Sequence, residues 1–180
     1  HRYFVNNFSR VNTVPKSELR NSDGSLVMNL ETADLSSLFD SGYQFPEPFK
    51  AKADDGITDI YGVIYKPFDF DENKKYPLLE YVYPGPQTES VNKSFSVRMD
   101  RLDRMAQLGF IVITLGNRGG HPHRSKWYHN YGYGDLRDYG LADKKYVAEQ
   151  LANRHSYIDI NKVGIYGHSG GGFMSTAAIL

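Results

Sequence analysis

The stretch that most constrains the fold is Gly167-His168-Ser169-Gly170-Gly171, a Gly-x-Ser-x-Gly motif near the end of the chain. An apolar run of β type, 163–166, enters the motif, and a run of small and apolar residues, 173–180, leaves it. A serine at a sharp strand-to-helix reversal adopts a strained backbone, so the flanking glycines are a steric requirement. The motif predicts an exposed hydroxyl at a helix N-terminus, where the helix dipole favours developing negative charge. An inert glycine-rich turn is the alternative.

Apolar runs alternate with segments of helical periodicity in the second half of the chain. This pattern predicts strands over 78–83, 110–115 and 163–166, and helices over 94–108, 135–152 and 173–180. Such alternation indicates an α/β fold with a parallel sheet and right-handed crossovers. Functional residues gather at the carboxyl ends of such strands, where Tyr83, Asn117 and Ser169 lie.

The first half favours antiparallel strands. We expect strands over 1–9, 13–20 and 26–30, a short helix over 32–40, a second hairpin over 49–52 and 57–65, and a polar loop over 67–75. Pro46 and Pro48 mark a domain boundary. Between the later strands we expect a loop over 119–134 with a helical turn near Trp127, and a turn at Asp159 and Asn161.

Composition excludes several classes of partner. The 21 basic residues balance the 21 acidic ones, which argues against a nucleic-acid-binding surface. No apolar run is long enough to span a membrane, and there is no cysteine for a disulfide. The chain starts at His1 within strand-like sequence and stops inside the helix after Ser169, so we expect it to be part of a longer protein.

Four segments, in this order, resemble the prolyl oligopeptidase family of α/β-hydrolases and, within it, the dipeptidyl peptidase IV-like branch. They are the strand and turn 78–86, Asn117-Arg118-Gly119, the segment 133–139 and the motif 167–171. The resemblance implies that residues 1–45 are the final strands of a β-propeller and a connecting segment. It implies that residues 46–180 are the N-terminal portion of the hydrolase catalytic domain.

The expected chemistry is acyl transfer. Ser169 would attack a carbonyl carbon and form an acyl-enzyme, with the backbone N–H of Gly170 donating to the oxyanion. The resemblance implies that the hydroxyl of Tyr83 is the second oxyanion donor; otherwise Tyr83 is an aromatic residue closing a core strand. No metal or organic cofactor is expected. The family implies a peptide substrate, a homodimer of the full-length protein, and export to a bacterial periplasm or secretion.

The general base and its orienting acid should follow the serine, in the order Ser, Asp, His. Residues 170–180 contain neither type, so the isolated chain should be inactive. His168 should point away from the Ser169 hydroxyl. His121, His123 and His129 are expected to be exposed loop residues, with a metal site at His121 and His123 as the alternative.

Several other polar and aromatic residues have two interpretations. Arg118 ties its loop to the sheet or meets substrate. Asp135 and Asp138 are expected to be acids at a helix N-terminus rather than the triad acid. A group of aromatic residues either lines a peptide cleft or packs a loop onto the body: Trp127, Tyr128, Tyr131 and Tyr133.

Three functions are therefore compatible with the sequence. The first is a serine peptidase of the dipeptidyl peptidase or oligopeptidase type. The second is an esterase or acylaminoacyl hydrolase, because Gly170 stands where the dipeptidyl branch commonly carries tyrosine, and glycine widens the pocket. The third is a catalytically silent hydrolase-fold interaction module, against which the intact Ser169 speaks. The paired glutamates that hold a substrate amino terminus in that branch belong to the propeller, upstream of this chain.

Overall fold

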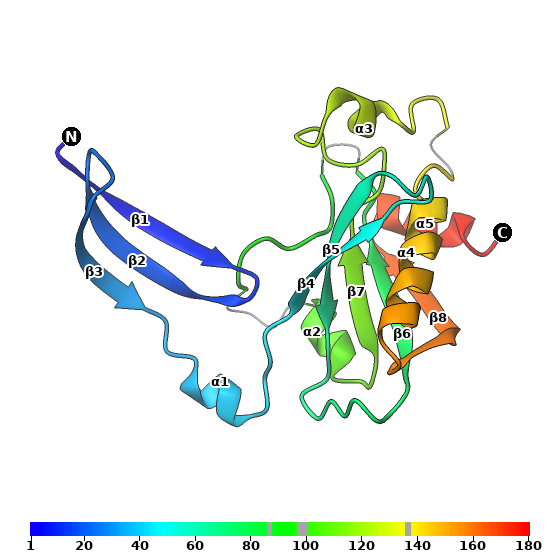
Figure 1. Cartoon of the computed structure of the whole chain (residues 1–180), viewed down its shortest axis with the longest axis horizontal. Helices are drawn as coiled ribbons and strands as arrows, with labels where there is room; N and C mark the ends of the chain where they lie inside the picture. Colours follow the sequence, from blue (N-terminus) through cyan, green and yellow to red (C-terminus); the bar gives the residue numbers. More distant parts are fainter. Residues whose placement is uncertain (86–87, 97–100, 136–137) are drawn as a thin grey trace.

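The chain forms two sheets, which a computed structural model describes for residues 1–85, 88–96, 101–135 and 138–180 (Figure 1). The first is an antiparallel sheet of three strands: β1 (Tyr3–Arg10), β2 (Thr13–Asn21) and β3 (Leu26–Thr32). The second has five strands in the order β4-β5-β7-β6-β8. Its strands are β4 (Glu47–Lys52), β5 (Asp59–Tyr65), β6 (Tyr76–Val82), β7 (Ile111–Leu115) and β8 (Ile158–Gly167).

Five helices accompany these strands in the described ranges. They are α1 (Ser36–Asp40), α2 (Arg101–Ala106), α3 (Lys126–Asn130), α4 (Leu141–Arg154) and α5 (Gly170–Ala177). Strand β6 pairs in parallel with both β7 and β8, as predicted, whereas β4, β5 and β7 pair in antiparallel fashion. The predicted α/β fold class is confirmed.

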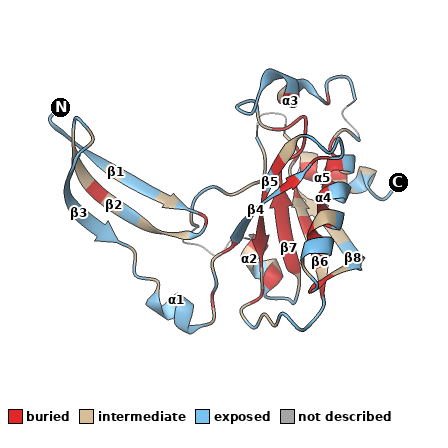
Figure 2. Cartoon of the chain, viewed as in Figure 1, coloured by how far each residue is buried: buried red, intermediate tan, exposed pale blue. Residues whose placement is uncertain are grey.

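The five-stranded sheet is covered on both faces, which explains its near-continuous apolar strands. On one face, Val147 and Leu151 of α4 pack against sheet residues that include Ile113. On the other face, Leu102 of α2 packs against sheet residues that include Val112. Alternate residues of β7 thus serve opposite layers, and all five are buried (Figure 2).

The three-stranded sheet has little core of its own. Large apolar side chains of β1 and β3 are between 41% and 55% exposed, among them Phe4, Val5, Phe8, Val27 and Met28 (Figure 2). Two residues in or directly after β1 connect this sheet to the rest of the chain. Val11 belongs to the same buried cluster as Leu102 of α2, and Ser9 Oγ accepts a hydrogen bond from the N–H of Phe95 at 3.2 Å.

Several predicted boundaries were wrong. Helix α4 begins at residue 141 rather than 135, and α1 begins at 36 because β3 continues to Thr32. The turn predicted at Asp159 and Asn161 lies inside β8, where the register against β6 is irregular. Asn161 still keeps turn character, because its N–H donates to the Asp159 carboxylate at 3.1 Å.

The helix predicted over 94–108 is described only from residue 101, since 97–100 lie outside the described residues. Pro86 of the predicted turn, and Leu136 of the predicted helix, also lie outside them. None of the helices in the described part of the chain has the length and apolar character needed to traverse a bilayer.

Candidate active site

The predicted strand–turn–helix around Ser169 is present. Strand β8 ends at Gly167 and helix α5 begins at Gly170, with Ser169 as the residue that precedes the helix. Ser169 has φ 55° and ψ −115°, and among the described residues it is the only non-glycine with positive φ. Such a backbone costs on the order of 1–3 kcal/mol, which the surrounding packing must offset. Ser169 is also exposed to solvent.

The glycines of the motif are required by the end of the neighbouring strand. A Cβ at Gly167 or at Gly171 would overlap the carbonyl oxygen of Val82, the last residue of β6. The parallel register pairs Val82 with Gly167, which brings the two strand ends level. This strand–turn–helix at residues 167–171, called the elbow below, therefore packs directly against Val82, the residue that precedes Tyr83.

The two predicted oxyanion donors lie at this same edge of the sheet. Gly170 is the first residue of α5, so its N–H has no acceptor within the helix. Tyr83 follows β6 directly, and its Cα lies 3.6 Å from the point where a Cβ would stand at Gly171. The half-buried Tyr83 lines a cavity of about 230 Å³ together with Tyr81, Thr88 and Glu89. The roles of Ser169, Gly170 and Tyr83 in catalysis stay predictions.

The loop that follows Tyr83 rests on the loop that follows β7. Gly85 has φ 116°, and a Cβ there would stand 3.4 Å from Cα of Gly120. The ring of Tyr139 fills the space left by Gly119 and Gly132, where a Cβ on either glycine would overlap it. Glycines thus allow these loops to approach one another closely.

Arg118 anchors the loop after β7 to helix α4 and to the β4–β5 hairpin. Its guanidinium is buried and donates from Nη2 to Asp143 at 2.6 Å and from Nε to both carboxylate oxygens of Asp143 at 3.0 and 3.1 Å. Its Nη1 also donates to Asp55 at 3.2 Å, and the guanidinium lies 4.2 Å from the ring centre of Tyr131. Arg118 is thus fully engaged within the protein, which favours the structural interpretation over contact with substrate.

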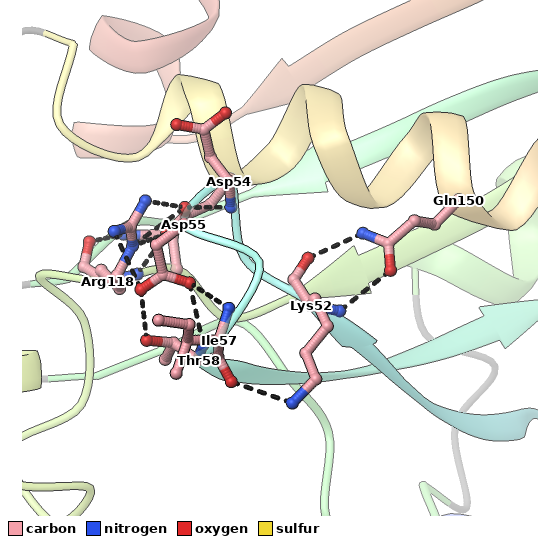
Figure 3. A network of polar contacts seen from close by, with 9 residues as sticks. Lys52, Asp54, Asp55, Ile57, Thr58, Arg118 and Gln150 are labelled. Atoms are coloured by element: carbon pink, nitrogen blue, oxygen red, sulfur yellow. Dashed lines mark hydrogen bonds and ion pairs between the residues drawn. The ribbon is translucent and has the colours of Figure 1, made fainter.

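Asp143 and Asp55 spread this anchor to other elements. Asp143 also accepts from the backbone N–H groups of Arg118 and Asp54, at 2.8 and 3.1 Å. Figure 3 shows Asp55 between Arg118 and Thr58, and Gln150 of α4 bonded to the backbone of Lys52. The network therefore joins the β4–β5 hairpin and α4 to the loop after β7.

Charge and hydrogen bonding decide the ionisation of this network. Burial opposes the charged guanidinium, but the hydrogen bonds and charge of Asp143 outweigh it and raise the pKa of Arg118. Burial also works to raise the pKa of Asp55, but hydrogen bonds from Thr58 and Ile57 prevail and lower it to about 2. Both groups are ionised at neutral pH.

A second buried ion pair links helix α4 to the sheet. Lys144 Nζ is 3.1 Å from Glu80 Oε1 and donates to the carbonyl of Leu115 at 3.1 Å. No hydrogen bond of good geometry reaches Glu80 Oε1 from the described residues, although the side chain is almost fully buried. Burial raises the pKa of Glu80, and Lys144 only partly offsets that effect.

The prediction for the acids near α4 was wrong. Asp135 and Asp138 precede the helix, which begins three residues after Asp138. The acid in the first turn is Asp143, and it is fully buried against Arg118.

Sequence reasoning missed Asp143, Glu80, Lys144 and Glu89. The helical spacing of Asp143 and Lys144 with Val147 and Leu151 was a usable signal, because it places both charges near the buried face.

Of the four aromatic residues in the loop after β7, one is buried and three are exposed. Tyr128 is buried and donates its hydroxyl to Glu89 at 2.7 Å, so it packs the loop onto the body. Trp127 is 58% and Tyr133 92% exposed. Tyr131 stacks beneath Arg118, as described above, and is 44% exposed.

No hydrogen bond among the described residues joins a histidine side chain to Ser169. His168 is exposed, and His129 Nδ1 lies 2.7 Å from the carbonyl oxygen of Gly120. The ring centres of His121 and His123 are 4.6 Å apart. Across the described ranges no three His, Cys, Asp or Glu residues gather as a metal site would require.

Comparison with known proteins gives a consistent result. The model of the prolyl oligopeptidase family matches residues 95–180. Human dipeptidyl peptidase 8 is 36% identical over 139 residues, which is 77% of this chain and 15% of that protein. A probable dipeptidyl-aminopeptidase B from Aspergillus terreus is 30% identical over 172 residues, which is 91% of this chain and 18% of that protein.

Solved structures agree with the sequence relatives. A putative dipeptidyl aminopeptidase IV from Bacteroides ovatus superimposes with a TM-score of 0.83 at 32% identity, covering 99% of this chain and 25% of that one. Dipeptidyl peptidase 4 from Porphyromonas gingivalis superimposes with a TM-score of 0.80 at 24% identity, covering 98% and 25%, and supports the fold alone.

The chain therefore spans about 15–18% of the curated relatives named here and a quarter of the solved ones. The elbow, the strand order and these matches lead to one conclusion. Residues 95–180 match the prolyl oligopeptidase family of α/β-hydrolases, and the chain resembles its dipeptidyl peptidase IV-like branch.

Proposed function

We propose that this chain contributes the nucleophile and oxyanion site of a longer serine peptidase of the dipeptidyl peptidase or oligopeptidase type. The observation that carries the proposal is the positive φ of the exposed Ser169 between β8 and α5. Natural proteins keep a strained non-glycine backbone chiefly where function requires it. The similarity to dipeptidyl peptidases supports a peptide as the substrate.

In the proposed reaction Ser169 Oγ forms a bond to the carbonyl carbon of the scissile peptide. The Oγ proton passes to a histidine base that we expect outside these 180 residues, together with its aspartate. The base then gives that proton to the leaving amine as the carbon–nitrogen bond breaks, leaving an acyl-enzyme. Water, deprotonated by the same base, releases the acyl group and restores the serine.

The oxyanion would be held by the N–H of Gly170 and the hydroxyl of Tyr83. One such donor contributes about 3 kcal/mol of transition-state stabilisation. The positions of both residues at the carboxyl edge of the sheet support these roles.

For the whole protein we propose three further properties. Residues 1–45, which include strands β1–β3, would complete a β-propeller that precedes a catalytic domain starting at residue 46. The full-length protein would be a homodimer, and it would be exported to a bacterial periplasm or secreted. Analytical ultracentrifugation and cell fractionation test the last two properties.

A second candidate is an esterase or acylaminoacyl hydrolase. A Cβ at Gly170 would have its nearest described neighbour, the carbonyl oxygen of Gly85, as far away as 4.0 Å. This open space beside the nucleophile would admit a wider range of acyl groups than a pocket closed by a tyrosine side chain.

Turnover of chromogenic substrates by the full-length protein tests the proposal. We expect hydrolysis of Gly-Pro or Ala-Ala p-nitroanilide that falls by roughly a thousandfold or more in Ser169→Ala. Faster hydrolysis of acyl esters than of either anilide would favour the second candidate. Absence of all hydrolysis by wild-type protein would favour a catalytically silent interaction module.

A further inference from the structure

Glu89 is a half-buried acid close to the proposed site, and the reaction described above leaves it without a task. It stands six residues after Tyr83 in the sequence. With Tyr83 and Thr88 it lines the 230 Å³ cavity described above. Its carboxylate accepts hydrogen bonds from the loop after β7 and from helix α3.

The carboxylate of Glu89 links two partners on that neighbouring loop. Oε1 accepts from the hydroxyl of Tyr128 at 2.7 Å and from the backbone N–H of His121 at 3.2 Å. Burial and then the charge of Glu89 raise the pKa of Tyr128, so its hydroxyl keeps the donated proton. Tyr128 is itself fixed, because its carbonyl accepts from the N–H of Gly119 at 2.6 Å.

Two glycines make room for this carboxylate. A Cβ at Gly116 would stand 2.7 Å from Glu89 Oε2, and a Cβ at Gly120 would overlap Oε1. The next residue, Ser90, adds a second anchor: its carbonyl accepts from the hydroxyl of Thr114 in β7 at 2.9 Å. The sequence of the loop after β7 is thus shaped to receive the Glu89 side chain.

These contacts hold Glu89 beside the cavity that it lines together with Tyr83. Tyr83 itself directly follows β6, whose last residue packs into the elbow. Donors to an oxyanion must be held to within about half an ångström, and misplacement by about 1 Å can cost roughly a hundredfold in rate.

We propose that Glu89 is a positioning residue, which holds the Tyr83 hydroxyl in register with Ser169 by binding Tyr128 and His121. The inference rests on the proposed function, since it gives Glu89 a role only through Tyr83. Glu89 does not touch the substrate in this account. It should therefore affect the maximal rate and not the affinity.

The test measures the rate at which a fluorophosphonate probe modifies Ser169 in the full-length protein, at saturating probe. In Glu89→Ala we expect this rate to fall by about tenfold or more, with the half-saturating probe concentration unchanged. Glu89→Gln keeps an acceptor oxygen and should stay within about threefold of wild type. Glu72→Ala, a loss of an exposed carboxylate in the loop between β5 and β6, is the matched control and should have no effect.

Combination with Tyr83→Phe separates positioning from general damage. Once the Tyr83 hydroxyl is absent, Glu89→Ala should lower the rate by less than about twofold, because coupled residues are not additive. Tyr128→Phe, which removes only the hydroxyl bound to Glu89, should show the same dependence and covers the case in which Glu89→Ala does not fold.

Equal losses with and without the Tyr83 hydroxyl, or no loss in either single variant, would overturn the inference while Ser169 still reacts. If the wild-type serine is not modified at all, the proposed function fails and this inference falls with it.

Discussion

Two adjacent residues of α4, Asp143 and Lys144, enter two buried ion pairs in different regions of the molecule. At the carboxyl edge of the sheet, Asp143 accepts several hydrogen bonds from Arg118 and two backbone N–H groups. Between α4 and strand β6, Lys144 faces Glu80, whose Oε1 lacks a well-directed hydrogen bond from the described residues. Both oxygens of Asp143 accept hydrogen bonds, whereas Glu80 Oε1 accepts none of good geometry from the described residues. We therefore call the first pair saturated and the second unsaturated.

The difference indicates which ion pair should lose less stability when one of its partners is removed. An arginine stays charged in a protein, so Arg118 cannot relieve the loss of Asp143 by releasing a proton. Glu80 can take up a proton, and burial has already raised its pKa. We therefore expect the loop edge, where the proposed site lies, to be the less tolerant region.

The largest expected effect is that of Asp143→Ala. Removing one partner of a buried ion pair leaves an uncompensated charge and typically costs about 3–5 kcal/mol. Denaturant titration of the full-length protein should show this loss in the transition of the hydrolase unit. Glu149→Ala, an exposed acid on the same helix, is the control and should change stability by less than about 0.5 kcal/mol. A loss for Asp143→Ala no larger than that of the control would contradict the saturated-pair description.

Lys144→Met should cost less, about 1–3 kcal/mol, because Glu80 can become neutral when its partner is gone. The same titration measures the change. The double variant Glu80→Leu with Lys144→Met should recover most of the loss, since an apolar replacement of a whole buried pair is often neutral or stabilising. If Lys144→Met proved as damaging as Asp143→Ala, the contrast between the two pairs would disappear.

The pH dependence should have opposite sign in the two regions and is the smallest effect, at most about 1 kcal/mol for a partly exposed group. The folded pKa of Asp55 lies below its ordinary value of 3.8, so its contribution is complete above that pH and is lost as the pH falls toward 2. The folded pKa of Glu80 lies above its ordinary value of 4.5, so its contribution is lost as the pH rises.

Stability measured from about pH 7 down to about pH 3 checks these signs. The advantage of wild type over Asp55→Asn should shrink as the pH falls below 3.8 toward 2. Wild type should instead improve relative to Glu80→Gln as the pH falls toward 4.5, and this improvement should level off below that pH. Parallel trends for the two variants would show that one of the two pKa directions is wrong.

Much of the architecture was predictable because it depends on local patterns. The apolar runs ending near Tyr83 and Leu115 predicted the buried parallel strands, and the glycines around Ser169 predicted the reversal. The start of α4 was not predictable in the same way. Tyr139 has helical spacing with Tyr146, but its ring is used to fill the space beside Gly119 and Gly132, so the helix begins after it.

The charged residues of the interior were the main omission. An Asp within a helix usually indicates a solvated face, and only the tertiary fold shows that Asp143 meets Arg118 from a different loop. The role proposed for Glu89 likewise depends on Gly116 and Gly120, which leave room for its carboxylate. These glycines form no sequence motif that would indicate a bound carboxylate. Contacts between segments far apart in the sequence leave no periodic signal.

The most direct test of the central claim is to map the site of fluorophosphonate attachment in the full-length protein by mass spectrometry of its peptides. We predict one phosphonylated residue, Ser169, and loss of labelling in Ser169→Ala. Labelling that persists in Ser169→Ala, or an adduct on another residue of wild-type protein, would contradict the assignment of Ser169 as the nucleophile.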